Sequence, residues 1–148
     1  MFHIASEEWT TMITGYRGRL REVKIIRDLS PQHAKFILSQ LDDLYSEVRL
    51  TYGDVRKQYD ETESLIERIR RKAESIGTNT EMRKANGVKS VENVELGDTR
   101  TINLYTIRTT LGHQKEDLDG ILAVIEKKQS VVITMSGLLK IESTISGH

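Results

Sequence analysis

Apolar residues recur along residues 30–77 with the spacing of one very long helix. Two series, each repeating every seven residues, run through this segment and form the seam of a coiled coil. The first series is Ala34, Leu41, Val48, Val55, Thr62, Ile69 and Ile76, and the second is Leu38, Tyr45, Tyr52, Tyr59, Ile66 and Ala73. Ser30 and Pro31 mark the start of the helix and Gly77 its end. Such a helix spans about 70 Å at roughly 1.5 Å per residue, so it needs partner helices.

Residues 99–148 carry a second seam of the same kind. Asp98 is expected to cap this helix, which should end near Ser143. Its main series is Leu104, Leu111, Leu118, Ile125, Val132 and Leu139, joined by Ile107, Ile121 and Met135 in the second series. Gln114 and Lys128 interrupt that second series, and polar residues at such positions usually fix the register or the number of helices. The simplest chain path for the two long helices is an antiparallel hairpin.

Residues 1–29 are predicted to form a shorter amphipathic helix. Ser6 can cap its start, and an apolar stripe continues to about Asp28. The stripe consists of Trp9, Ile13, Tyr16, Leu20 and Val23. Gly15 and Gly18 each weaken a helix by about 1 kcal/mol relative to alanine, so this helix should depend on docking against other helices.

The segment 78–98 loses the helical pattern. It is rich in turn residues; Glu81–Ala85 could make one helical turn, and Val88–Leu96 alternates too irregularly to predict a strand. We therefore expect a mobile, polar and basic connector at the tip of the hairpin. The chain as a whole is predicted to be one elongated all-α domain with four parts, at residues 1–29, 30–77, 78–98 and 99–148.

The width of the apolar face favours assembly beyond a single hairpin. Ile37, Leu44 and Leu65 extend the face past a strict two-position seam, which is typical of a multi-helix bundle. We expect a homo-oligomer whose interface includes Leu41, Val48, Tyr52, Val55, Tyr59, Ile69, Leu111, Leu118, Ile125 and Val132. The alternative is a monomeric three-helix bundle, which would leave part of the long helix unpaired or bend it near Gly53.

Composition and charge narrow the function classes. Charged residues make up 30% of the 148 residues and aromatic residues 5%, a composition of long helices. Lys plus Arg (22) equals Asp plus Glu (22), so any binding to nucleic acid or to an anionic membrane must be local. The sequence has no cysteine, no targeting signal and no apolar run long enough to span a bilayer. We expect a soluble cytoplasmic protein that does not bind membranes.

The sequence offers little support for catalysis. The four histidines lie far apart without the spacing of metal ligands, and the motifs of phosphate-binding loops and nucleophile elbows are absent. Glu116, Asp117 and Asp119 are adjacent acids that point in different directions on a helix, which is typical of a solvated face. The chain is therefore predicted to be no enzyme and to need no cofactor or metal.

Two basic clusters are the candidates for a binding site. The first has an excess of five positive charges at the predicted hairpin tip and consists of Arg68, Arg70, Arg71, Lys72, Arg83, Lys84 and Lys89, against Glu74 and Glu81. The second is Arg17, Arg21 and Lys24, predicted to share one face of the first helix. Both could contact phosphates, and a ring of such patches in an oligomer would act together. The alternative is that they are solvated or paired with acids. Tyr45, Tyr52 and Tyr59 are interpreted as bundle core rather than as stacking platforms for bases.

The order of elements resembles the phage recombination mediators of the UvsY type. The stretches EVRLTYGDVRKQYDETESLIERIRRKAES and INLYTIRTTLGHQKEDLDGILAVIEKKQS carry the resemblance, which covers about residues 30–143. It implies an oligomeric accessory protein of a phage-infected host cell. That protein would bind single-stranded DNA and help a RecA-like recombinase to replace a single-strand binding protein. The alternative is a structural or adaptor coiled-coil protein, such as a virion assembly component, whose seam binds another helical protein.

Overall fold

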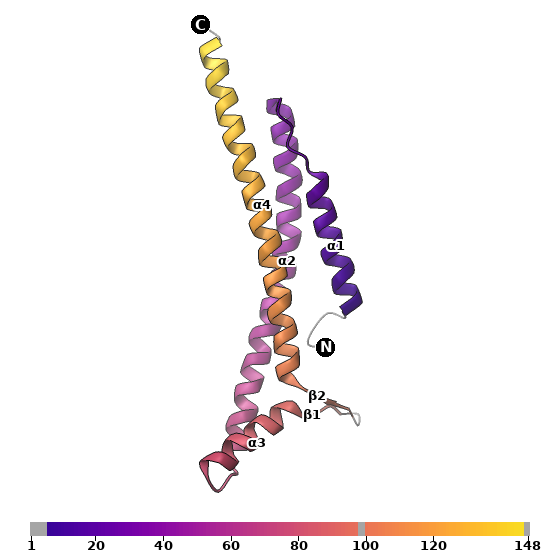
Figure 1. Cartoon of the computed structure of the whole chain (residues 1–148), viewed down its shortest axis with the longest axis vertical. Helices are drawn as coiled ribbons and strands as arrows, with labels where there is room; N and C mark the ends of the chain where they lie inside the picture. Colours follow the sequence, from indigo (N-terminus) through magenta and orange to yellow (C-terminus); the bar gives the residue numbers. More distant parts are fainter. Residues whose placement is uncertain (1–5, 98–99, 147–148) are drawn as a thin grey trace. The chain divides into compact units, whose positions relative to one another are not determined.

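The computed structural model describes residues 6–97 and 100–146, with side chains described through residue 137. The chain is an all-α helical bundle, as predicted (Figure 1). Its elements are α1 (Ser6–Glu22), α2 (Pro31–Glu74), α3 (Thr80–Glu92), β1 (Val94–Glu95), β2 (Thr101–Ile102) and α4 (Leu104–Ser146). The two short strands pair antiparallel, with Val94 opposite Ile102.

The helices belong to two compact units, which we describe separately. The central unit is the continuous segment 53–115, and the terminal unit joins residues 6–52 to residues 116–146. The helices α2 and α4 each contribute one part to either unit.

The terminal unit is a three-helix bundle of α1, the first part of α2 and the later part of α4. Its apolar core includes Trp9, Ile13, Tyr16, Leu20, Ile37, Leu41, Leu44, Val48, Leu118, Ile121, Leu122, Ile125 and Val132. Polar contacts fix the three helices at the rim of this core. The hydroxyls of Tyr16 and Thr51 share a hydrogen bond of 2.8 Å between α1 and α2. The amide of Gln129 on α4 donates to Asp42 on α2 at 2.7 Å.

The central unit packs the later part of α2 against the start of α4. The two helices run antiparallel, and Arg108 of α4 forms an ion pair of 3.2 Å with Glu63 of α2. The core includes Val55, Thr62, Ile66, Val91, Leu104, Ile107 and Leu111. The helix α3 follows α2 after a turn, and its buried Gly87 approaches α2 closely, because a Cβ there would lie 3.1 Å from a carboxylate oxygen of Glu74.

The helix boundaries follow the predicted caps at one end of α2 and differ elsewhere. The backbone N–H of His33 donates to the Ser30 hydroxyl at 3.1 Å, which is the predicted cap. The other predicted cap, Asp98, lies outside the described residues. The side chain of Asn103 caps α4 instead and accepts from the backbone N–H of Tyr105 at 3.0 Å.

The connector contains more regular structure than the single helical turn expected from its sequence. The helix α3 runs over Thr80–Glu92, because Asn79 caps its start and accepts from the backbone N–H of Met82 at 2.8 Å. Gly87 lies inside this helix, where its lack of a side chain permits the approach to α2. The first helix is shorter than expected and ends at Glu22 rather than near Asp28.

Most seam residues assigned to an oligomer interface are buried within a single chain. The fully buried ones are Leu41, Val48, Val55, Leu111, Leu118, Ile125 and Val132, whereas Tyr52, Tyr59 and Ile69 are half-buried. In the terminal unit the second buried series of α2 is shifted by one position, because Ile37 and Leu44 are buried while Leu38 and Tyr45 are half-exposed. The residues that widen the face thus pack inside the bundle. The side chain of Leu139 lies outside the described residues, and formation of a homo-oligomer stays a prediction.

Candidate nucleic-acid interface

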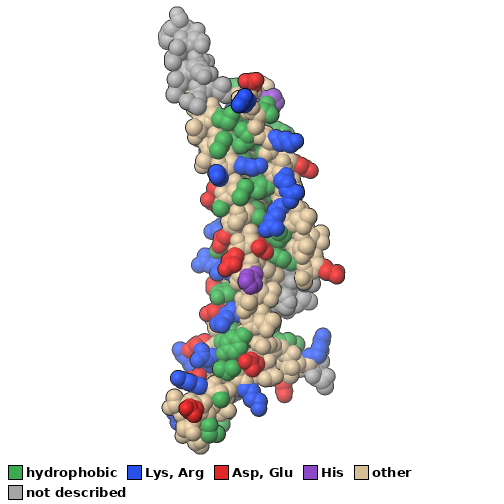
Figure 2. All heavy atoms as spheres, viewed as in Figure 1, with side chains coloured by type: hydrophobic (Ala, Val, Ile, Leu, Met, Phe, Trp, Pro, Cys, Tyr) green, Lys and Arg blue, Asp and Glu red, His purple; other side chains and the backbone are tan. Residues whose placement is uncertain are grey.

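The basic cluster at the junction of α2 and α3 lies entirely in the central unit, and three of its seven members have structural partners. Arg70 pairs with Glu74 at 3.4 Å, and Arg71 pairs with Glu67 at 2.9 Å, each across one turn of α2. These pairs neutralise much of the local charge. Figure 2 shows Lys and Arg side chains gathered with acidic ones on one face of the molecule.

Arg83 closes the turn between α2 and α3. Its Nε donates to the carbonyl of Gly77 at 2.9 Å, and its backbone N–H donates to the carbonyl of Asn79 at 2.9 Å. The approach is so close that a Cβ on Gly77 would lie 2.6 Å from Cγ of Arg83 and 2.7 Å from its backbone nitrogen. Glycine is therefore required at residue 77, and the guanidinium of Arg83 stabilises the turn.

The remaining four cations of the cluster are open to a ligand. Arg68, Lys72, Lys84 and Lys89 are exposed and form no ion pair or side-chain hydrogen bond with the described part of the chain. Two of them follow the C-terminal part of α2 and two lie on α3. They give the central unit a set of positive charges that water alone screens.

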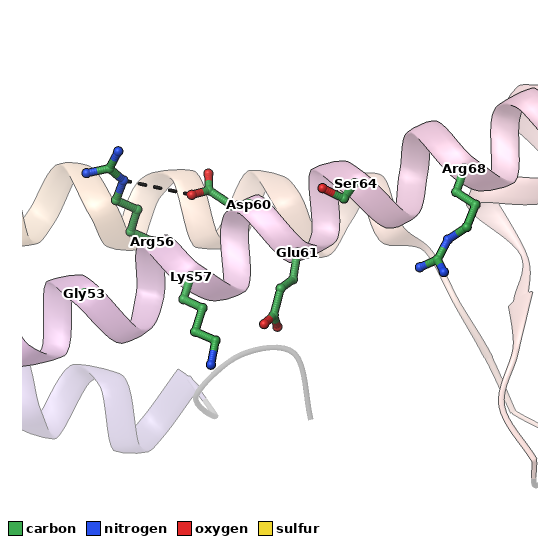
Figure 3. A pocket seen from close by; sticks show the side chains of 7 residues that line it. All are labelled: Gly53, Arg56, Lys57, Asp60, Glu61, Ser64 and Arg68. Carbon is green, nitrogen blue, oxygen red and sulfur yellow. Dashed lines mark ion pairs between the residues drawn. The ribbon is translucent and has the colours of Figure 1, made fainter.

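Arg68 also lines a shallow groove of about 510 Å³ along the polar face of α2 (Figure 3). The other lining residues are Gly53, Arg56, Lys57, Asp60, Glu61 and Ser64. Lys57, Glu61 and Arg68 project from the same side of the helix in Figure 3, whereas Arg56 turns to Asp60 at 4.0 Å. The groove mixes three cations with two acids, so it extends the basic surface only weakly.

The second predicted cluster is not a single helical face. Arg17 and Arg21 are exposed on α1, but Lys24 lies beyond its last residue, Glu22. Arg17 lines a groove of about 290 Å³ in the terminal unit, together with the acidic side chain of Asp117. This cluster is therefore less suited to phosphate than the four open cations of the central unit.

A neighbouring cation on α1 is neutralised. Arg19 forms a hydrogen-bonded ion pair with Glu47 of α2, and its second nitrogen lies 3.2 Å from the other carboxylate oxygen. This hydrogen bond lowers the pKa of Glu47 below its usual value and raises the pKa of Arg19.

The tyrosines of the α2 seam lie at the rim of the bundle, where cations or acids already contact them. Tyr45 donates to Glu126 at 3.3 Å, and the guanidinium of Arg49 lies 5.2 Å from the ring centre of Tyr52. In the central unit Lys115 lies 4.4 Å from the ring centre of Tyr59. These contacts agree with the interpretation as bundle residues rather than as a stacking ladder.

A second cation and aromatic pair was not found from the sequence. Arg108 lies 5.2 Å from the ring centre of Tyr105, and it also pairs with Glu63. The spacing of three residues on one helix was an available signal, since side chains at that spacing are neighbours on a helix surface.

The described part of the chain offers no other site for chemistry. No three metal-binding side chains gather within it, and none of its helices is both long and apolar enough to cross a membrane. Comparison of the chain with known protein families, curated proteins and solved structures gave no match. The argument for function therefore rests on the surface of the bundle.

Proposed function

We propose that this chain is a non-enzymatic accessory protein that binds single-stranded DNA and assists a RecA-like recombinase. The observation that carries the proposal is the group of four exposed and unpaired cations in the central unit, Arg68, Lys72, Lys84 and Lys89. The resemblance to UvsY-type mediators supports the choice of single-stranded DNA among possible polyanions.

The type of binding follows from the charge distribution. The chain has no net charge, so no long-range field concentrates DNA around it. Contacts through lysine and arginine to phosphates carry no sequence information, which suits a protein that must act on any single strand. An oligomer would multiply this weak contact through effective concentration, and its cytoplasmic setting in a phage-infected cell belongs to the same proposal.

The binding experiment uses fluorescent oligo(dT) and two variants that remove the same charge. Lys72, Lys84 and Lys89 are changed together to Gln, and the control changes Arg27, Lys35 and Lys127, which are exposed cations of the terminal unit. For single strands the slope of log affinity against log salt is about −0.7 per phosphate contact, so the first variant should flatten the slope by roughly two. The control should leave the slope unchanged. Equal slopes for the wild-type protein and the first variant would refute the site.

The mediator role needs its own measurement. The ATPase of a RecA-like recombinase is followed on single-stranded DNA already covered by a single-strand binding protein. Addition of the wild-type chain should shorten the lag before ATP hydrolysis, and the variant of Lys72, Lys84 and Lys89 should not. DNA binding without any effect on the lag would refute the mediator role while leaving the DNA site intact.

The second candidate function is a structural or adaptor protein. Exposed apolar side chains of the terminal unit, Phe36, Leu50 and Ile133, favour it because they could contact another helical protein. Association through apolar side chains should depend little on salt, whereas phosphate contacts weaken steeply as salt rises. The same titration therefore separates the two candidates.

A further inference from the structure

Two apolar side chains are exposed on either side of the turn between α2 and α3. Ile76 is 74% exposed and Met82 is 49% exposed. The Thr78 hydroxyl donates to the sulfur of Met82 at 3.2 Å, which places the methionine side chain beside the turn. Methionine adapts its shape readily and is common on surfaces that bind protein segments.

The turn that carries these side chains is well fixed by hydrogen bonds. Arg83 and Gly77 close it, as described above, and Asn79 caps the start of α3. The Ser75 hydroxyl donates to the carbonyl of Lys72 at 2.6 Å and completes the end of α2. A surface that is already ordered loses little conformational entropy when a ligand binds.

Two open cations flank the apolar pair along the chain. Lys72 precedes Ile76 by one helical turn, and Lys84 follows Met82 by two residues. Both are exposed and have no partner within the described residues, whereas Arg70 and Arg71 of the same segment are paired with acids. We call Lys72, Ile76, Met82 and Lys84 the tip surface.

We propose that the tip surface binds an acidic protein segment that also carries apolar side chains, and that this segment competes with single-stranded DNA for Lys72 and Lys84. Charge complementarity selects the acidic partner, and the exposed Ile76 and Met82 select a partner with apolar side chains. The inference rests on the proposed function and adds a way to regulate it, because a bound segment would occupy two of the four cations that contact DNA.

The chemistry of the apolar pair favours a protein segment over the other ligands of a basic surface. Sequence-independent contacts to unpaired bases use the flat rings of aromatic residues, and Ile76 and Met82 have none. A stable hold on a lipid surface needs far more apolar area than two side chains provide.

The experiment uses the full chain and a fluorescent synthetic peptide in which Asp and Phe alternate. The double variant Ile76→Ser, Met82→Ser should bind the peptide about tenfold more weakly, the loss expected when an interface anchor is removed. Its affinity for oligo(dT) should stay unchanged because no charge is altered. Leu50→Ser is the matched control, since Leu50 is 73% exposed on the terminal unit, and it should change neither affinity. Circular dichroism verifies that all variants keep the wild-type helix content.

Competition and peptide variants complete the test. Unlabelled oligo(dT) should displace the peptide from the wild-type chain, and peptides with Asn for Asp or Ser for Phe should bind weakly. Unchanged peptide affinity in the serine variant would refute the proposal, because binding would then need charge alone. Loss of oligo(dT) affinity in that variant would also refute it, because the apolar pair would then contact bases. If the wild-type chain binds the peptide but no DNA, the proposed function fails while the peptide site stands.

Discussion

Lys128 occupies a position of α4 where the heptad pattern predicts an apolar residue. Its ammonium group donates to the carbonyls of Leu20 at 2.8 Å and Val23 at 3.1 Å, at the end of α1. Carbonyls at the end of a helix lack partners within the helix and carry partial negative charge, so a cation there is favourable. The polar interruption in the seam therefore serves α1.

Changing Lys128 to Met should lower the free energy of unfolding by about 1.5–3 kcal/mol, the range for hydrogen bonds to charged groups. Urea unfolding followed by circular dichroism measures it. The control is Lys127→Met, which alters an exposed neighbour and should have almost no effect. Equal stability of the two variants would mean that Lys128 does not hold the end of α1.

The pair of Arg19 and Glu47 gives a prediction about protonation. The hydrogen bond from Arg19 lowers the pKa of Glu47 below its ordinary value of 4.5. The pair therefore stabilises the fold above the ordinary pKa, and this contribution disappears as the pH falls through the lowered value. In an NMR titration, Arg19→Gln should return the pKa of Glu47 to its ordinary range, while Arg21→Gln should leave it low. A pKa that does not respond to Arg19→Gln would contradict the pair.

Gln114 gives a prediction of opposite sign. Its side chain is 4% exposed, and its carbonyl oxygen has no hydrogen-bond partner within the described residues. Gln114→Leu should therefore raise the free energy of unfolding by roughly 1–3 kcal/mol, the cost of a buried unpaired polar group. The control Gln32→Leu, at an exposed position of α2, should have little effect on chemical unfolding. Loss of stability in Gln114→Leu would show that a bound water satisfies the oxygen.

At the scale of elements, α1 depends on its docking. Trp9 is buried and its indole N–H donates to Asp117 at 3.4 Å, while Gly15 and Gly18 weaken the helix itself. Burial of Trp9 and its apolar neighbours therefore supplies most of the stability of α1.

Trp9→Ala should remove about 3–5 kcal/mol of packing and release α1 from the terminal unit. Hydrogen exchange should show faster exchange of the α1 amides, with the amides of the central unit unchanged. Thr10→Ala serves as control because the Thr10 hydroxyl bonds only to the carbonyl of Ser6 in the same helix, at 2.9 Å. Retained protection of α1 in Trp9→Ala would contradict this account.

The sequence predicted the three longer helices because their patterns are repetitive and strong. It missed most of α3, whose helix depends on two contacts that no local pattern reveals. Asn79 caps it, and Gly87 lets it approach Glu74 of α2. Glycine in a helix interior and a weakly periodic sequence both favour a loop prediction, so tertiary packing decided the structure.

The candidate site was predicted only as a list of cations. Sequence spacing placed Arg70 and Arg71 one turn from acids, so their pairing could have been anticipated. The bond from Arg83 to Gly77 could not, because it depends on how the turn closes. The separation of four open cations from three engaged ones therefore needed the structure.

At the scale of the whole molecule, Val55 tests which contacts form the seam. It is fully buried within one chain, so Val55→Asp places an unpaired carboxylate in the core of the central unit, at a cost of several kcal/mol. We expect this variant to lose much of its helical circular dichroism at every protein concentration, whereas Lys57→Asp, on the exposed face of α2, should not. A variant that stays helical but loses mass in light scattering would instead place Val55 between chains.

Light scattering of the wild-type chain tests the predicted homo-oligomer directly. Because the predicted seam is mostly buried within one chain, an oligomer would have to use residues that stay exposed, such as Phe36, Leu50 or Ile133 of the terminal unit. A monomer at micromolar concentration would contradict the prediction.

The division of the chain into two units has a consequence for the order of folding. The central unit is one uninterrupted segment, residues 53–115, whereas the terminal unit must join residues 6–52 to residues 116–146. Closing a long loop has an entropic cost that rises with loop length, and early formation of the central unit shortens the loop that the terminal unit has to close. In pulse-labelled refolding, the amides of the central unit should therefore gain protection before those of α1.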